Sequence, residues 1–210
     1  MHSGARAFAL IAAVACAIPA KAGLNSGGAV SLSWSPDSLV FQADCAPVNT
    51  VYVTCKRSGG LTFAGGEVLL SWVFGLPAPA RHDPTGVAGC VSYLQAVYPQ
   101  STTCNALNDG STTVLTEETL SESFGGYVHL AWLNSKTTTG CDSGLVAQVQ
   151  IESDTCAPCG ALVWVQSATA FDGTSSDLLA VEDLGLFLGD GPSFPVVPTT
   201  WGAIKDLMRR

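Results

Sequence analysis

The sequence contains few charged residues and few histidines, and this scarcity limits the kinds of protein that it can encode. Of 210 residues, 9 are Lys or Arg, 17 are Asp or Glu and only 3 are His. So few basic residues, on a chain with a net charge of −8, predict no nucleic-acid partner and no attraction to anionic membranes. Helix-favouring runs of Glu, Lys and Ala are also missing, whereas Ser, Thr and Gly are abundant. That balance is typical of a secreted β-protein.

Long apolar segments are a second absence. The apolar run 7–17 is too short to span a bilayer, and no later stretch is long and apolar enough, so we predict no membrane span in the mature chain. Residues 1–22 instead have the features of a secretory signal peptide, with Arg6 at the charged start and Ala20-Lys21-Ala22 as the cleavage site. We expect cleavage near Ala22 and a secreted, extracellular or cell-surface location; lipid attachment at Cys16 is the alternative. Cleavage would leave 7 basic and 17 acidic residues.

Catalytic residue types are scarce as well. A Ser-His-Asp hydrolase needs a histidine held between a nucleophile and an acid, and the mature chain offers only His82 and His129. No serine lies in a Gly-x-Ser-x-Gly turn. We therefore predict that the chain is not an enzyme and needs no cofactor, with a secreted hydrolase as the least favoured alternative. Carboxylates that a glycosidase could pair are candidates by type only: Glu117, Glu118, Glu122, Glu152, Asp154, Glu182 and Asp183.

A repeated pattern gives the main evidence for the fold. Val-x-Leu-(Ser or Ala)-Trp occurs at 30–34, 68–72 and 128–132. Because side chains alternate along a strand, each copy places its Val, Leu and Trp on one face. We expect these faces to share one core, together with strands at 39–42, 51–56, 112–115, 144–151, 161–171 and 184–188. About nine short strands at this spacing favour an antiparallel sandwich. We also expect a short helix at 91–98, an acidic loop at 116–126 and a polar turn at 134–140.

Seven cysteines remain after the predicted cleavage, and export favours disulfides. The pairing stays open, and proximity suggests Cys90 with Cys104, then Cys45 with Cys55, then Cys141 with Cys156 or Cys159. The C-x-x-C spacing at 156–159 is that of a redox site, but a strand follows it where a redox site needs a helix. We interpret these two cysteines as structural residues that cross-link a loop.

Two kinds of ligand site have candidate residues. Asp172, Asp177 and Asp190 could contribute to a structural Ca²⁺ site, but their spacing does not match an EF-hand, so we favour turn formation. Four tryptophans are available as a sugar-binding platform, although burial in the core is the favoured interpretation: Trp34, Trp72, Trp132 and Trp164.

The C-terminal segment 192–210 has a different composition from the rest. Prolines at three-residue spacing predict an extended linker, and Thr200 can cap a short helix. An apolar stripe then suggests docking or surface sorting, and packing against the acidic domain is the alternative: Trp201, Ile204 and Leu207 or Met208. The predicted organisation is a signal peptide at 1–22, a β-sandwich at 23–191 and a linker with an amphipathic tail at 192–210.

The order of the strands at 144–152, 161–173 and 184–191 resembles the C-terminal half of cohesin-type modules, the immunoglobulin-like sandwiches of bacterial scaffolding proteins. The resemblance covers most of 51–191, and the cysteines depart from the usual pattern. It implies an antiparallel two-sheet sandwich and a binding role, and it gives no site residue. We therefore predict a non-catalytic exported bacterial module that binds another secreted or surface protein. A carbohydrate-binding module with a glycan ligand is the alternative.

Overall fold

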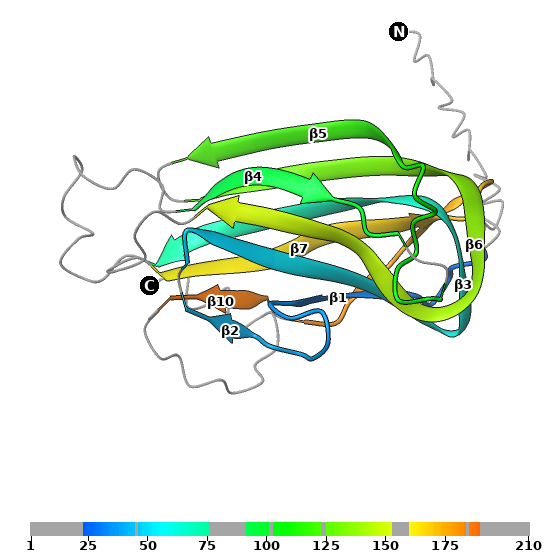
Figure 1. The fold of residues 1–210 in the computed structure, drawn as a ribbon, viewed down its shortest axis with the longest axis horizontal. Helices are drawn as coiled ribbons and strands as arrows, with labels where there is room; N and C mark the ends of the chain where they lie inside the picture. The colour runs from blue at the N-terminus through cyan, green and yellow to red at the C-terminus, as the bar shows by residue number, and fades with distance from the viewer. Residues whose placement is uncertain are drawn as a thin grey trace, which may run out of the picture.

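The computed structural model describes residues 23–44, 46–75, 91–100, 103–122, 125–152, 160–183 and 185–189. These residues form strands, turns and extended chain without any helix (Figure 1), so the predicted all-β class is confirmed. Within them, no helix is long and apolar enough to cross a membrane. The strands are β1 Ala29–Ser33, β2 Gln42–Ala43, β3 Val48–Gly75, β4 Ser92–Val97, β5 Thr113–Glu122, β6 Gly125–Glu152, β7 Gly160–Phe171, β8 Ser176–Leu178, β9 Ala180–Val181 and β10 Leu186–Leu188.

Two long strands build both layers of the sandwich. β3 and β6 each have 28 residues, and they pair antiparallel from Val48–Glu152 to Val73–Gly125. Their register is irregular between Lys56 and Gly65, and Figure 1 shows both strands curving over at one end of the molecule. The pair therefore belongs to one layer before the curve and to the other layer after it.

The remaining strands extend these two layers. In the first layer, β5 pairs with the start of β6, β7 pairs with the end of β3, and β10 and β2 continue the sheet beyond β7; β8 pairs with the end of β7. We call this layer the β7 sheet. In the second layer, β4 pairs with the end of β6, and β1 and β9 follow the start of β3. We call this layer the β1 sheet.

Gly65 shows why the strands can turn between layers. Its φ of 154° lies in a region that side chains rarely adopt, and a Cβ there would collide with the carbonyl oxygen of Trp132. Only glycine allows the backbones of β3 and β6 to approach so closely at this point.

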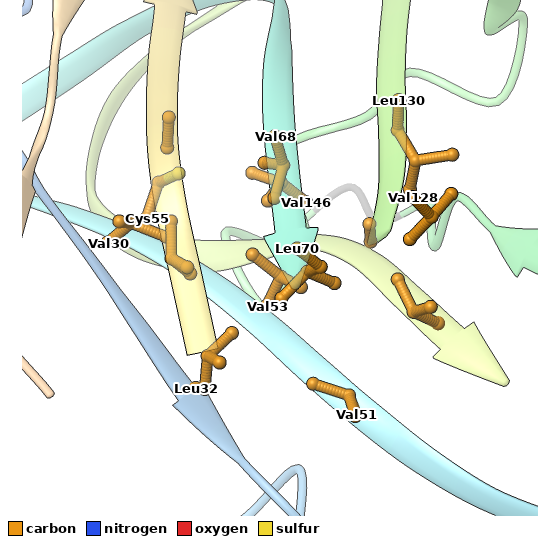
Figure 2. Close-up of a cluster of buried hydrophobic side chains, with 14 of the residues drawn as sticks. Val30, Leu32, Val51, Val53, Cys55, Val68, Leu70, Val128, Leu130 and Val146 are labelled. Carbon is orange, nitrogen blue, oxygen red and sulfur yellow. The ribbon is translucent and has the colours of Figure 1, made fainter. Parts of the chain in front are cut away.

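The core lies between the two sheets, as Figure 2 shows for side chains from both. Trp72 and Trp132 are 2% and 1% exposed, so two of the three repeated patterns bury their indoles as predicted. Trp34 is half-buried against the core, and its Nε1 donates to the carbonyl oxygen of Phe187 at 2.9 Å. Trp164 is a correction, because it lies with Leu162 on the outer face while Val163 faces the core. Both alternate faces of β7 are apolar, so the pattern did not decide which one is buried.

Three local predictions were wrong. The predicted helix at 91–98 contains strand β4 at 92–97 instead, the acidic segment 116–122 belongs to β5, and the polar segment 134–140 is part of β6. The physical reason is the same in each case. Backbone pairing with a neighbouring strand overrides the local pattern, since β4 and β5 both hydrogen-bond to β6, and the segment 134–140 pairs with β3 through Thr138 and Thr139.

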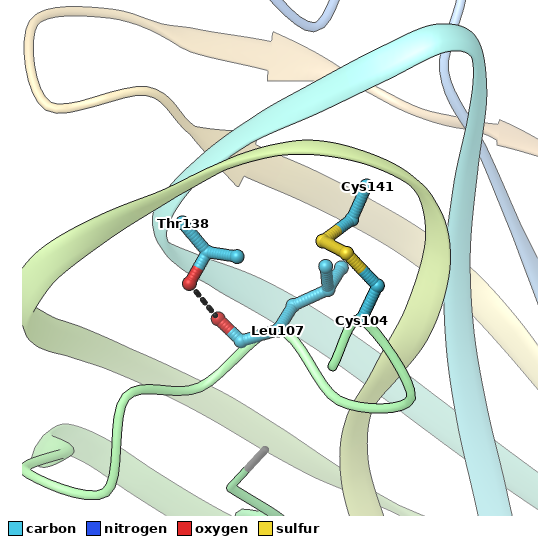
Figure 3. Close-up of a disulfide and its surroundings, with 4 residues drawn as sticks. All are labelled: Cys104, Leu107, Thr138 and Cys141. Carbon is cyan, nitrogen blue, oxygen red and sulfur yellow. Dashed lines mark hydrogen bonds between the residues drawn. A yellow bond between two sulfur atoms is a disulfide. The ribbon is translucent and has the colours of Figure 1, made fainter. Parts of the chain in front are cut away.

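The cysteine pairings also need correction. Cys104 is bonded to Cys141 with a Cα–Cα distance of 5.3 Å (Figure 3), so neither Cys90–Cys104 nor a bond from Cys141 to Cys156 or Cys159 forms. Cys55 is a buried free thiol on the inward face of β3, and burial raises its pKa to about 12; the expected bond to Cys45 is therefore wrong too. Proximity in sequence failed because β6 carries Cys141 back to the segment around Cys104. The other four mature cysteines lie outside the described residues.

Candidate binding surface

The outer faces of the two sheets differ in chemistry. On the β1 sheet, most residues that alternate with the buried positions of β3 and β6 are polar: Thr50, Tyr52, Thr54, Gln148 and Gln150. Val48 and Val97 are single exposed apolar residues on the same face. A one-sided sheet normally has such a polar face toward water. Single exposed apolar residues among polar ones are common on protein surfaces and need no partner to explain them.

The β7 sheet has an apolar outer face. Six side chains from four strands alternate with core residues and point outward, and we call them the apolar patch: Leu69, Val73, Leu120, Tyr127, Leu162 and Trp164. Five of them are half-buried, and Leu120 is 42% exposed. Among the described parts of the chain, no further layer of strands lies over this face (Figure 1).

Strand register makes the patch continuous. Leu120 lies opposite Tyr127, Tyr127 opposite Ser71, and Ser71 opposite Trp164. In the next row, Val73 lies opposite Leu162. Residues directly opposite on one face have Cβ atoms about 5 Å apart, so these side chains form one surface across β5, β6, β3 and β7.

Acidic and polar residues border the apolar patch. Glu118 lies opposite His129, and His129 lies opposite Leu69. Glu67 continues the same face of β3. Ser71 lies inside the patch, between Tyr127 and Trp164, and its hydroxyl donates to Gln166 Oε1 at 3.0 Å. His129, one of the two histidines that the sequence offered for catalysis, therefore sits half-buried on a flat sheet face. His82 lies outside the described residues.

The four tryptophans do not form a row on one face. Trp72 and Trp132 are buried, and Trp34 is hydrogen-bonded to the Phe187 carbonyl oxygen. Of the four, Trp164 alone belongs to the apolar patch. The structure thus gives the predicted sugar platform no row of exposed indoles.

Among the described residues, the carboxylates that the sequence offered for catalysis are dispersed. Glu117 accepts a hydrogen bond from the Tyr93 hydroxyl at 2.5 Å, and burial, followed by this contact, raises the pKa of Tyr93. Glu182 forms an ion pair with Lys56. Asp183 accepts from the Leu32 N–H at 3.1 Å, and burial is the main reason that its pKa is raised.

The remaining carboxylates of that set lie on other strands or outside the description. Glu118 is on β5, and Glu152 ends β6. The side chains of Glu122 and Asp154 are outside the description.

Asp172 and Asp177 act as hydrogen-bond acceptors. Asp172 Oδ1 accepts from the backbone N–H groups of Thr174 and Ser175 at 2.8 and 2.7 Å, as expected for a turn. Both aspartates also accept from N–H groups of residues 23–25. Within the described ranges, no three His, Cys, Asp or Glu side chains gather as metal ligands would, and Asp190 is outside those ranges.

Sequence reasoning missed a buried polar cluster beside the disulfide. Asn108 is fully buried; its Nδ2 donates to the Val146 carbonyl oxygen at 2.7 Å, and its Oδ1 accepts from Trp132 Nε1 at 2.9 Å. Next to it, desolvation alone would raise the pKa of Asp109, but hydrogen bonds from Ser111, Ser135 and Lys136 outweigh it and lower the pKa to about 2. Only the polarity of 108–111 inside an otherwise apolar fold hinted at this cluster. These hydrogen bonds connect the segment after Cys104 to β6, with Asn108 buried and the contacts of Asp109 at the surface.

No protein-family model matches the sequence, and no curated protein sequence matches it. Similar solved structures do exist. The sixth cohesin of scaffoldin B from Acetivibrio cellulolyticus, solved in complex with a mutant dockerin, is 13% identical, with a TM-score of 0.45 over 78% of this chain and 99% of that chain.

Two further solved structures give similar values. A cohesin module from a family 33 glycoside hydrolase of Clostridium perfringens is 10% identical, with a TM-score of 0.44 over 78% of this chain and 97% of that chain. The second type II cohesin of an adaptor scaffoldin from Acetivibrio cellulolyticus is 14% identical, with a TM-score of 0.42 over 81% of this chain and 99% of that chain. All three are cohesin modules, the family that the strand order of 144–191 resembles.

Proposed function

We propose that this chain is a non-catalytic, exported module that binds another protein through the apolar patch. One observation carries the proposal: apolar side chains are contiguous across four strands on the outer face of the β7 sheet, whereas the equivalent face of the β1 sheet is mostly polar, with only scattered apolar residues. Contiguous apolar surface is costly to leave in water and commonly marks an interaction site.

The composition of the apolar patch indicates what the partner presents. Tyr127 and Trp164 are the residue types that contribute most to binding energy in protein interfaces. A flat apolar face bordered by Glu67 and Glu118 fits an amphipathic helix whose apolar stripe is flanked by Lys or Arg. The predicted mature chain has 7 basic and 17 acidic residues, so its field attracts such a helix. A second copy of this chain would bring like charges together.

The tail belongs to the same proposal. Residues 192–210, with Trp201, Ile204, Leu207 and Met208, lie outside the described residues. We propose that this segment docks or sorts the exported protein and that the sandwich itself folds without it.

Matched lysine substitutions on the two sheets test the binding role. Trp164→Lys puts a charge into the apolar patch, and Gln148→Lys puts the same charge on the polar outer face of the β1 sheet. We expect the wild type and Gln148→Lys to retain one specific protein from the extracellular fraction of the source organism. Trp164→Lys should retain at least tenfold less, because it buries a charge at the contact. Circular dichroism shows whether both variants are folded, and equal retention by both folded variants would exclude the apolar patch as the interface.

A further inference from the structure

The first residues after the predicted cleavage site are held by two aspartates from the far end of the chain. The Gly23 N–H donates to Asp177 Oδ1 at 2.9 Å, and the Asn25 N–H donates to Asp177 Oδ2 at 2.8 Å. Between them, the Leu24 N–H donates to Asp172 Oδ2 at 3.1 Å. Three consecutive backbone N–H groups thus converge on two carboxylates.

Other hydrogen bonds hold both Asn25 on one side of this contact and Asp172 on the other. Asn25 is fully buried; its Nδ2 donates to the Thr62 carbonyl oxygen at 2.8 Å, and its Oδ1 accepts from the Thr62 N–H at 2.9 Å. Asp172 is 7% exposed and is held by donors from Thr174 and Ser175. The position of Gly23 against Asp177 is therefore set by the fold.

Residue 23 is also closely surrounded. A Cβ on Gly23 would collide with the Asp177 carboxylate and with the Ser175 hydroxyl. Glycine at this position lets its nitrogen approach the carboxylate, which a larger residue would prevent.

We propose that Gly23 is the first residue of the mature protein and that its α-ammonium group forms an ion pair with Asp177. Hydrolysis of the Ala22–Gly23 bond by a signal peptidase adds one water molecule. The carbonyl carbon of Ala22 takes the hydroxyl oxygen and leaves as a carboxylate, and the nitrogen of Gly23 becomes an ammonium group. The nitrogen that donates one neutral hydrogen bond before cleavage then carries a full positive charge 2.9 Å from Asp177 Oδ1. Cleavage therefore strengthens the contact between Asp177 on β8 and the first residue of the mature chain.

The pKa of the α-ammonium distinguishes pairing from simple burial. An ordinary terminal amine has a pKa of about 7.7–8.0. Burial without a partner would lower it, whereas a nearby carboxylate raises it. A pKa raised by pairing adds stability that is fully present below about pH 8 and is lost as the pH rises through the folded-state value.

The experiment uses the exported full chain, purified after secretion from a bacterial host. Intact mass and N-terminal sequencing should show Gly23 as the first residue. The rate at which an amine-reactive ester labels this terminus, followed against pH, should give a pKa at least one unit higher in the folded protein than in urea. At neutral pH, this difference corresponds to labelling about tenfold slower in the folded protein.

Asp177→Asn should return the folded pKa to the value in urea, and Asp142→Asn, at an exposed position of β6, should leave it unchanged. If Asp177→Asn does not fold, the α-ammonium pKa of the wild type, compared between the folded protein and the protein in urea, still distinguishes pairing from burial. A different first residue, an unchanged or lowered pKa, or a folded Asp177→Asn with the wild-type pKa would each overturn the proposal.

Discussion

Among single residues, those that bury a polar group are expected to contribute most to the stability of this fold. Inside the sandwich, Trp132 Nε1 donates a hydrogen bond to Asn108 Oδ1. Asn108 Nδ2 in turn donates to the Val146 carbonyl oxygen. The sequence predicted that Trp132 is buried, because the repeated pattern placed it beside Val128 and Leu130. It could not predict Asn108 as the partner, since the contact depends on the path of a segment 24 residues earlier in the chain.

Asn108→Ala should lower the free energy of unfolding by about 2–4 kcal/mol, because it leaves buried donors and acceptors without partners. In a Trp132→Phe background the same change should cost less, since the indole N–H is already gone. Urea unfolding of the four proteins in a double-mutant cycle measures the coupling. Equal costs in both backgrounds would show that the two side chains do not interact.

Asp172 makes the free energy of unfolding depend on pH in the acidic range. Hydrogen bonds from Ser175, Leu24 and Thr174 hold its pKa well below the usual range, so its contribution is present above the unfolded pKa of about 4 and is lost as the pH falls below it. Asp172→Asn should therefore destabilise the protein at pH 7 and have a smaller effect near pH 2. Thermal melts across this range measure the difference, with Asp142→Asn as the control. A loss of the same size at every pH would assign the effect to packing and not to the charge.

At the scale of elements, the fold is predictable where strands alternate clearly and unpredictable where pairing decides. Residues 51–56 alternate, and the strand pattern places Val51, Val53 and Cys55 in the core, where the structure has them. In 144–151 the same alternation is correct for Ala147, Val149 and Ile151 but wrong for the first residues, because the bulge between Val53 and Thr54 buries Val146 and leaves Leu145 half-buried. β4 and β5 are different. Their side chains show helical or loop patterns, and they are strands because each completes the hydrogen bonding of one edge of β6.

The disulfide depends on the same long-range register. Leu107 donates to the Leu145 carbonyl oxygen at 2.8 Å, and Leu145 donates to the Asn105 carbonyl oxygen at 3.1 Å, which brings Cys104 beside Cys141. No local pattern encodes this meeting. The sequence therefore predicted that disulfides form, but not that Cys104 pairs with Cys141 or that Cys55 stays free.

Removing this disulfide should cost about 4 kcal/mol of unfolding free energy, the value expected for closing a loop of 37 residues. Cys104→Ser and Cys141→Ser should each show this loss in guanidinium unfolding. Cys55→Ala, which removes a free thiol, should show only the smaller cost of a lost core side chain. Peptide mapping under non-reducing conditions should recover a peptide joining Cys104 to Cys141, and a peptide joining Cys90 to Cys104 would contradict the described fold.

At the scale of the whole molecule, the two sheets divide the surface into a polar face and an apolar one. The sequence predicted a two-layer sandwich and a binding role, but not the outer face that we propose as the interface. Leu162 and Trp164 alternate with Val163 and Val165, and both sets are apolar. Only the assembled sheet shows that β5, β6, β3 and β7 align their outward side chains into the apolar patch.

Deleting residues 198–210 should leave the sandwich folded, because its core lies within the described strands. We expect the thermal midpoint to stay within about 2 °C, while the share of protein released into the medium changes relative to the share retained at the cell surface. Replacing Trp201 and Ile204 with Ser gives a full-length control for the apolar stripe. Unchanged fractionation of both variants would remove the sorting role of the tail.

The binding face is tested most directly by photo-crosslinking from the two sheets. A photoreactive phenylalanine analogue at position 164 samples the apolar patch, and the same residue at position 150 samples the polar outer face of the β1 sheet. After mixing with the extracellular fraction of the source organism, we expect one cross-linked product from position 164, with the added mass of a different protein, and none from position 150. Products from both positions, from 150 alone, or only between two copies of this chain would contradict the account.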